Sequence, residues 1–588
     1  MPDDTMPRGD VPQGEVPHGE VPTIRDAGSA DRPAVPARGA WWRSAVIYQI
    51  YPRSFADANN DGMGDLPGIR GRLPYLAALG VDAVWLSPFF RSPQADAGYD
   101  VADYRDVDPL FGTLADFDTM LADAHALGLR VIVDLVPNHT SDAHEWFREA
   151  LASPPGSPER RRYIFRDGRG PEGEEPPNNW QSVFGGPAWT RAPDGGRWGP
   201  SQWFLHLFDG RQPDLDWRQP EVRAEFEAVL RFWLDRGVDG FRVDVAHGLI
   251  KAEGLPDWDG QATMVGEDAD ADRADGINYG PMWDQDEVHA IYRDWRRVLD
   301  RYEGDRMMVA EAWVRPSERL MRYVRPDEMH QAFNFDFLLA RWDGAAMRQV
   351  IDHSLRAADA VGAPASWVLS NHDTVRHTAR YGLAVPGARP KGIDAASEQP
   401  DEALGLRRAR AILFLTMALP GALYLYQGEE LGLPEHTALP AAVRQDPAFR
   451  RTGGAEIGRD GCRVPLPWDA DAPTLGFNQG AAPWLPQPDS FRRYAARQQE
   501  GVAESTLELH RALLGLRREH GLGAGRLRWI SAPEASMLVL ENGAIRAAVN
   551  LGREAAALPP GRELLRSDGR KAEPGWLPPD TGVWFRIT

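Results

Sequence analysis

The chain has 588 residues and a formal net charge of -20 at pH 7, and its composition, 43% hydrophobic and 26% charged, is that of a globular protein. This length is too great for one compact core, so we expect about two or three structural units, one of which could be a large barrel. The excess of acidic residues would repel phosphate backbones and anionic lipids, so neither nucleic acid nor a membrane is an expected partner.

The first segment, residues 1–39, is rich in Pro, Gly and acidic residues and contains the repetitive stretch "GDVPQGEVPHGEVP". Such a segment cannot bury enough apolar surface to offset its ordering entropy, which predicts a disordered acidic tail. It lacks the basic and apolar regions of a secretory signal, and no apolar run approaches the ~20 residues needed to cross a bilayer. We therefore expect a cytoplasmic protein.

From Trp41 onward, short apolar runs alternate with amphipathic helical patterns such as residues 114–128 and 221–237. This alternation predicts parallel strands joined by crossover helices, a fold of the α/β class. We assign residues 40–139 and 217–503 to a closed (β/α)₈ TIM barrel, which eight such strands fit better than an open sheet. The eight predicted strands begin at Ala45, Val81, Leu129, Val238, Arg306, Ala332, Ser366 and Gly421.

Two segments depart from this alternation. Residues 140–216 contain many Pro, Gly and Trp residues and no long periodic helix, which predicts an inserted subdomain after the third strand. Residues 504–588 begin with one amphipathic pattern and continue with short apolar runs, which predicts a terminal helix and a C-terminal antiparallel β domain. Cys462 is the only cysteine, so no internal disulfide can form, and we expect it to be a packing residue.

Acidic side chains follow three of the predicted strands: Asp244 in "GFRVDVAHG", Glu311 in "AEAW" and Asp373 in "SNHD". Active sites of such barrels lie at the carboxyl ends of the strands, so closure of the barrel would bring these three groups around one cavity. Other strand ends carry further polar residues, namely Asp134, Asn138, His139, Glu429 and Glu430.

Three carboxyl groups in one cleft could bind a metal ion, transfer a phosphoryl group through that metal, or hydrolyse a glycoside. The chain has neither an H-E-x-x-H pattern nor a Gly-rich phosphate loop, which disfavours the first two uses. Glycoside cleavage needs one ionised and one protonated carboxyl group. Arg242 lies on the same strand face as Asp244 and is expected to keep it ionised, whereas Glu311 has no such cation nearby in sequence. Taken alone, an Arg-x-Asp pair is more often a structural ion pair.

Four segments, "DLVPNH", "GFRVDVAHG", "AEAW" and "LSNHD", resemble in order and spacing the signature regions of the α-amylase family of glycoside hydrolases, family thirteen. The resemblance extends from about Trp41 to the end of the chain. It implies that Asp244 is the nucleophile, Glu311 the general acid/base and Asp373 the acid that stabilises the transition state, with retention of configuration. It also implies that no organic cofactor is needed and that three further residues contact the substrate: Arg242, His139 and His372.

Within this family, the chain resembles the α-glucosidase and oligo-1,6-glucosidase branch. "GYDVADY" would supply Tyr99 as an aromatic platform and Asp100 as an acid, and Arg463 in "GRDGCRVPLPWD" matches the late arginine that closes the pocket with that acid. Phe184 of the insert resembles a pocket-lining position. A pocket closed in this way admits one terminal glucose of a small oligosaccharide. A structural salt bridge is the alternative for Asp100 and Arg463.

The resemblance therefore implies a retaining, exo-acting α-glucosidase that releases α-glucose from maltose and short malto-oligosaccharides and transfers some glucose to other acceptors. In relatives, Val after the nucleophile, as at Val245, accompanies α-1,6 cleavage, but longer matches such as "MHQAFNFDFLL" favour α-1,4 bonds. The alternatives are an oligo-1,6-glucosidase and a sucrose-active transglucosylase or isomerase. An inactive scaffold protein is disfavoured by the three acids. We expect a monomer or a homodimer.

The loop "DANNDGMGDL" places oxygen ligands at the alternate spacing of a calcium-binding loop. It differs from an EF-hand because a strand precedes it and because Gly68 stands where an EF-hand has its bidentate Glu. In relatives the same loop holds Ca²⁺ or Mg²⁺, so the resemblance implies a structural ion with no catalytic role. Its ligands would be Asp57, Asn59, Asp61, the carbonyl of Met63, and Asp65.

Overall fold

The structure is a computed structural model that describes residues 40–193, 201–260, 280–388, 390–530, 536–558, 560–569 and 575–587. The tail predicted at residues 1–39 lies outside the described residues. Within the described ranges, no helix combines the length and the apolar character needed to cross a membrane.

Eight parallel strands form the central sheet, in the order β11-β10-β9-β5-β2-β1-β13-β12. The two ends of this order meet where the hydroxyl of Ser366 donates to the carbonyl of Ala332 at 2.5 Å. The sheet is thus nearly closed and forms the barrel that the alternating sequence predicted. Its strands are β1 (Val46–Ile50), β2 (Ala83–Leu86), β5 (Arg130–Leu135), β9 (Gly240–Val243), β10 (Met307–Ala310), β11 (Gln331–Ala332), β12 (Ser366–Val368) and β13 (Ala422–Tyr426).

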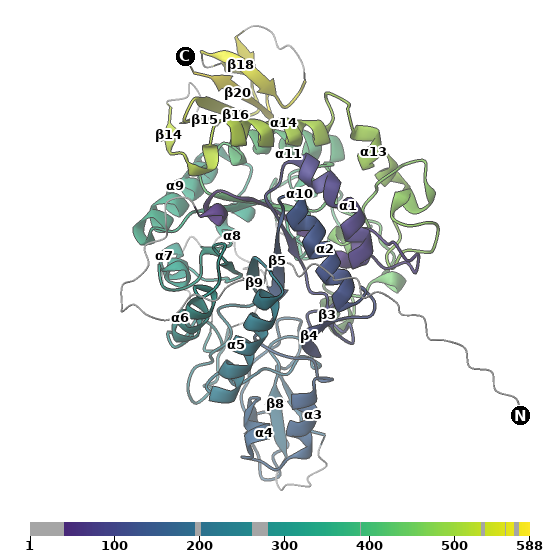
Figure 1. Ribbon diagram of the computed structural model, residues 1–588, viewed down its shortest axis with the longest axis vertical. Coiled ribbons are helices and arrows are strands. Elements are labelled where there is room, and N and C mark those ends of the chain that lie inside the picture. Colours follow the sequence, from purple (N-terminus) through teal and green to yellow (C-terminus); the bar gives the residue numbers. More distant parts are fainter. Residues whose placement is uncertain are drawn as a thin grey trace, which may run out of the picture.

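Long helices cover the outside of this sheet (Figure 1). Their apolar residues recur every three or four positions, and in α5 the buried set includes Val222, Phe226 and Trp233. Side-chain caps fix where helices begin: Asp65 accepts from the amide of Gly68 at 2.6 Å at the start of α1. The helices are α1 (Leu66–Leu79), α2 (Leu114–Ala126), α5 (Pro220–Asp235), α6 (Val288–Leu299), α9 (Gly344–Val361) and α11 (Glu402–Thr416).

The sixth strand is much shorter than the sequence predicted. The apolar run from Ala332 was expected to be extended, but β11 ends at that residue. Asn334 then caps the short helix α8 (Phe335–Leu338) by accepting from the amide of Phe337 at 3.0 Å. A short apolar run does not distinguish a buried strand from a buried helix, and here the capping residue decides between them.

The insert after β5 forms its own small layer at the lower end of the molecule in Figure 1. Three antiparallel strands, β6 (Phe165–Asp167), β8 (Gln202–Leu205) and β7 (Trp189–Arg191), lie beside helices α3 (Glu145–Ala152) and α4 (Pro158–Arg161). A bridge between His139 and Asp214 closes the insert where it leaves and rejoins the barrel. A short hairpin of β3 (Phe90–Arg91) and β4 (Asp103–Val107) follows β2.

The C-terminal part begins with helix α14 (Thr506–Glu519), as predicted. It continues with an antiparallel sheet of β14 (Leu527–Trp529), β15 (Met537–Asn542), β16 (Ile545–Asn550), β20 (Thr581–Arg586) and β18 (Arg562–Arg566), and with the pair β17 (Ala556–Ala557) and β19 (Trp576–Leu577). The indole of Trp584 donates to the carbonyl of Phe414 in α11 at 2.7 Å, which joins this sheet to the barrel. The remaining short helices are α7 (Ser317–Leu320), α10 (His377–Arg380), α12 (Pro447–Arg451) and α13 (Ala496–Gln499).

Candidate active site

The carboxyl ends of the barrel strands surround a cavity with about 520 Å³ of empty space, part of which is open to solvent. Asp244, Glu311 and Asp373 follow β9, β10 and β12, and all three line this cavity. The structure therefore brings the three predicted catalytic acids to one place.

The strand register sets the position of Arg242. In the parallel ladder between β5 and β9, Asp134 lies directly beside Arg242, whose Nη1 donates to the Asp134 carboxylate at 2.8 Å. The same nitrogen forms an ion pair with Asp244, and Nη2 lies 3.7 Å from a carboxylate oxygen of Glu311. One buried guanidinium thus faces both acids that the sequence predicted to act on the glycosidic bond.

Glu311 is held by two neighbours that also line the cavity. Its two carboxyl oxygens accept hydrogen bonds from the backbone amide of Val245 and the indole of Trp313, each at 2.6 Å. Val245 has a φ of 44°, which is rare for a β-branched residue and costs free energy. This strained turn, directly after Asp244, aims the Val245 amide at Glu311.

Asp244 and Glu311 both have pKa values above those of ordinary carboxyl groups. Burial raises the pKa of Asp244 well above its usual range, with further increases from Glu311 and other carboxylates, although Arg242 lowers it. Burial also raises the pKa of Glu311. Arg242 thus lowers the pKa of Asp244, in the direction that the sequence predicted, but does not outweigh burial and the neighbouring carboxylates. Two carboxyl groups so close titrate as one system, and direct contact with Arg242 favours leaving the shared proton on Glu311.

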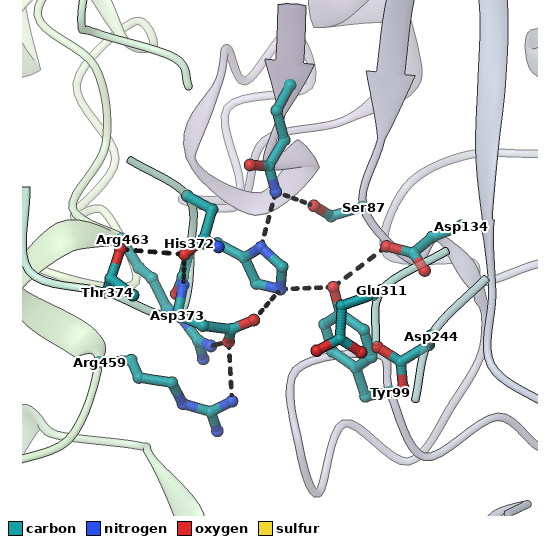
Figure 2. Close-up of polar contacts among 12 residues, drawn as sticks. Ser87, Tyr99, Asp134, Asp244, Glu311, His372, Asp373, Thr374, Arg459 and Arg463 are labelled. Carbon is teal, nitrogen blue, oxygen red and sulfur yellow. Dashed lines mark hydrogen bonds and ion pairs between the residues drawn. The ribbon is translucent and has the colours of Figure 1, made fainter. Parts of the chain in front are cut away.

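Asp373 has the opposite electrostatic environment. Burial would raise its pKa, but the adjacent His372 ring and the guanidinium groups of Arg459 and Arg463 outweigh this effect and hold the pKa of Asp373 below its usual range. Arg459 contacts it at 3.1 Å and Arg463 at 3.0 Å (Figure 2). Asp373 is therefore ionised over the whole working pH range, as a group that stabilises positive charge must be.

A chain of polar contacts through His372 and Tyr99 links Asp373 to Asp134 (Figure 2). The amide of Gln49 donates to Nδ1 of His372 at 2.6 Å, so the opposite nitrogen of this neutral ring carries the proton. That nitrogen lies 3.2 Å from Asp373 and 2.5 Å from the hydroxyl of Tyr99, which itself donates to Asp134 at 3.1 Å. The Tyr99 ring stacks on the His372 ring with centroids 5.3 Å apart.

The remaining predicted contact residues divide between the cavity wall and the layer behind it. Tyr99, His139 and Phe184 line the cavity, and burial lowers the pKa of His139 to about 3, so its ring is neutral. Arg242 and His372 are buried behind the wall and orient the residues that face the cavity.

The predicted pair of Asp100 and Arg463 is wrong. Asp100 is fully buried and accepts from the amides of Ala95 and Asp96, at 2.8 and 2.9 Å, which closes the turn between them. The acid on the cavity wall is Asp96, and Arg459 contacts it at 2.9 Å. Asp96 and Asp100 are four residues apart, as are Arg459 and Arg463, and only the turn geometry shows which of each two faces the cavity.

Arg459 is the centre of a charged cluster that the sequence did not single out. Besides Asp96 and Asp373, it contacts Asp446 at 2.6 Å. Burial raises the pKa of Asp96 to about 6 in spite of the nearby guanidinium. We call Asp96, Tyr99, His139, Asp373 and Arg459 the polar wall of the cavity.

A group of apolar residues lines another part of the cavity. Val245 and Trp283 from the barrel belong to one hydrophobic cluster with Val183, Phe184 and Phe208 from the insert. All five line the cavity, and we call them the apolar wall. Of these, the sequence predicted a pocket-lining role for Phe184 and linked Val245, directly after the nucleophile, with bond preference, whereas no motif marks the other three.

A buried lysine joins the insert to the loop after Asp244. The ammonium of Lys251 contacts the carboxylate of Asp214 and the side-chain carbonyl of Asn138, each at 2.7 Å, and the backbone carbonyl of Gly248 at 2.5 Å. Asp214 lies at the base of the insert and Asn138 follows β5. One cation therefore fixes three segments relative to each other.

The predicted metal loop has its carboxylates turned toward its own backbone. Asp57 accepts from the amides of Asn60 and Gly62, and Asp65 from those of Ala58, Asn59 and Gly68. Met63 donates its amide to Asp61 at 2.8 Å. Among the described residues, no group of three or more His, Cys, Asp or Glu converges as a metal site. A structural ion held by Asp57, Asn59, Asp61, the Met63 carbonyl and Asp65 therefore stays a prediction.

A (β/α)₈ barrel with three carboxyl groups at its strand ends, all facing one cavity, defines an enzyme of the glycoside hydrolase type. The catalytic domain of α-amylase matches residues 49–524 of this chain. The chain belongs to the α-amylase family of glycoside hydrolases.

Sequence relatives carry glucosidase names. A probable α-glucosidase of Rhizobium meliloti (strain 1021) is 39% identical over 507 residues, which are 83% of this chain and 85% of that protein. An oligo-1,6-glucosidase of Parageobacillus thermoglucosidasius is 35% identical over 518 residues, which are 82% of this chain and 84% of that protein.

Solved structures share the fold over nearly the whole chain. The α-glucosyl transfer enzyme XgtA has a TM-score of 0.78 and 37% identity, covering 93% of this chain and 100% of its own. The trehalulose synthase MutB from Pseudomonas mesoacidophila MX-45 has a TM-score of 0.78 and 30% identity, covering 94% of this chain and 100% of its own.

Proposed function

We propose that the protein is a retaining, exo-acting α-glucosidase that releases α-glucose from the non-reducing end of maltose and short malto-oligosaccharides. The observation that carries this proposal is the polar wall, where Arg459 bridges Asp96 and Asp373. These buried groups present fixed donors and acceptors for the hydroxyls of one terminal sugar. A wall of paired charges at one end of the cavity supports binding of a chain end over binding of a chain interior.

The first chemical step uses both acids next to Arg242. Asp244 attacks the anomeric carbon while Glu311 gives its proton to the glycosidic oxygen, so the bond to the leaving sugar breaks and an ester to Asp244 forms. Asp373, held ionised by Arg459 and Arg463, stabilises the positive charge that develops on the glucosyl ring.

The second step reverses these roles. A water molecule enters from the side that the leaving sugar vacates, Glu311 takes its proton, and the oxygen attacks the anomeric carbon. The ester bond breaks and Asp244 returns to the carboxylate. Two inversions at one carbon give net retention.

Glucosyl transfer is a second candidate activity, favoured by the apolar wall. A second sugar that binds beside Val245 and Trp283 would exclude water and attack the ester with its own hydroxyl. The likeness to the α-glucosyl transfer enzyme XgtA supports this candidate. The two activities share every catalytic group and differ only in the acceptor.

One assay tests the proposed function. The purified protein is incubated separately with maltose, isomaltose, sucrose and trehalose, and the initial products are followed by proton NMR. We expect maltose to be the preferred substrate and the newly formed anomeric centre to be α, so that the first products contain more α-glucose than the reducing end of maltose supplies. An excess of β-glucose over the share that comes from the reducing end would overturn the double displacement, and clear preference for isomaltose or sucrose would replace the proposed specificity with one of the alternatives.

A further inference from the structure

His247 lies on the cavity wall, and neither catalytic step gives it a task. Its side chain is only 6% exposed, and its Nδ1 has no hydrogen-bond partner among the described residues. Burial lowers the pKa of His247 to about 3, so the ring is neutral and has one donor and one acceptor nitrogen. A buried polar atom without a partner destabilises the protein unless a ligand or water supplies one.

The position of His247 is fixed through its ring and through its backbone. Its imidazole stacks on the indole of Trp283, with ring centroids 4.8 Å apart and planes 25° apart. Its backbone carbonyl accepts from the amide of Asp284 at 2.7 Å. A Cβ at Gly248 would come within 2.8 Å of the Trp283 ring, so the glycine after His247 allows this close approach.

The contacts of Glu311 show which side of the glycosidic bond His247 occupies. A general acid must lie next to the oxygen of the leaving group, so residues around it surround the leaving sugar. The loop that carries His247 is bonded to Glu311 twice, through the amide of Val245 to the carboxyl group and through the amide of Ala246 to the backbone carbonyl. His247 therefore belongs to the leaving-group side, together with Trp283.

We propose that His247, held in place by Trp283, determines specificity for the leaving group by hydrogen bonding to a hydroxyl of the sugar on that side of the bond. The inference rests on the proposed function. It predicts that the enzyme prefers a polyhydroxylated sugar as the leaving group over an aryl or alkyl alcohol. An acceptor sugar in transfer occupies the same place, so His247 also favours sugar over water as the acceptor.

The test compares two substrates that differ only in their leaving groups, maltose and p-nitrophenyl α-glucoside. The variant His247→Phe keeps an aromatic ring against Trp283 but removes both ring nitrogens. We expect the ratio of kcat/KM for maltose to kcat/KM for the aryl glucoside to fall by about 10- to 100-fold, because a buried hydrogen bond to the substrate is lost. His247→Gln, which keeps polar atoms, should restore part of the ratio.

Two controls separate this effect from general damage. His353→Phe makes the same exchange on helix α9 and should leave the ratio at the wild-type value. The melting temperature of each variant reports folding. If His247→Phe lowers kcat/KM for both substrates by the same factor while remaining folded, His247 only shapes the site and the proposal is overturned.

A crystal structure that keeps His247 tests the proposal even if His247→Phe does not fold. In a crystal structure of the Glu311→Gln enzyme with maltose, we expect a hydroxyl of the second sugar within hydrogen-bond distance of an imidazole nitrogen of His247. A second sugar in contact with neither nitrogen would contradict the inference. Failure of the proposed function looks different, because the wild-type enzyme would then release little or no glucose from maltose.

Discussion

The polar and apolar walls of the cavity hold a substrate in different ways. On the polar wall, Arg459 contacts three carboxylates, so the loss of one group leaves others buried and unpaired. On the apolar wall, ring and methyl groups such as those of Phe208 and Val245 make contacts that are individually weak and tolerate exchange. The comparison suggests strict recognition of the terminal glucose and adjustable recognition of its partner.

The largest effect should come from a change to the nucleophile, which acts on a substrate held by either wall. Asp244→Asn removes the nucleophile, so we expect kcat to fall by about 10³-fold or more for every substrate. Glucose release under saturating maltose measures this, with Asp359→Asn on the exposed surface of α9 as the matched control. Near-normal turnover by the variant would refute the assignment of Asp244.

Arg459 tests the polar wall alone. Arg459→Lys keeps the positive charge but lacks the planar guanidinium group, so it cannot contact three carboxylates at once. We therefore expect kcat/KM for maltose to fall by roughly 100-fold. Arg459→Ala should also lower the melting temperature, because it leaves buried carboxylates without their cation. Kinetics close to wild type for the lysine variant would mean that this wall does not hold the terminal sugar.

Val245 tests the apolar wall. Val245→Ala removes two methyl groups from the leaving-group side, and differences of this size alter discrimination by about tenfold. We expect the ratio of kcat/KM for maltose to kcat/KM for isomaltose to change by no more than about that factor, with both activities retained. Loss of all activity in a folded variant would mean that the Val245 side chain does more than adjust recognition of the second sugar.

The pH dependence sharpens the comparison within the catalytic pair. Activity needs Asp244 ionised and Glu311 protonated, and burial raises the pKa of both, so both limbs of the kcat/KM profile should lie above the usual carboxyl range. Activity is lost on the acid side as Asp244 binds a proton and on the basic side as Glu311 releases one. In Glu311→Gln, assayed with the aryl glucoside, the basic limb should vanish. A basic limb at the wild-type pH would assign it to another group.

The sequence predicted the barrel and its three acids because strand-end motifs and strand order are local properties. Asp244, Glu311 and Asp373 needed no knowledge of contacts, since parallel strands bring their carboxyl ends together. Asp96 and Arg459 were missed because the local turn decides which of two acids, and which of two arginines, faces the cavity. Trp283 lies far from any motif.

The electrostatics were harder to predict than the positions. Arg242 was correctly placed beside Asp244, yet its effect on the pKa depends on how deeply the pair is buried and on Glu311, which comes from another strand. The run after Ala332 shows the same limit for secondary structure, because its apolar pattern suits a strand and a helix equally and one side-chain cap decided the outcome.

Lys251 gives the enzyme a positive charge that is covalently part of the chain. Three oxygens from separate segments surround its ammonium much as they would surround a bound ion. An exchangeable ion leaves when its concentration falls, but a lysine cannot be diluted away or removed by a chelator. The insert, which supplies Val183, Phe184 and Phe208 to the cavity, therefore stays attached to the nucleophile loop whatever the salt composition of its surroundings.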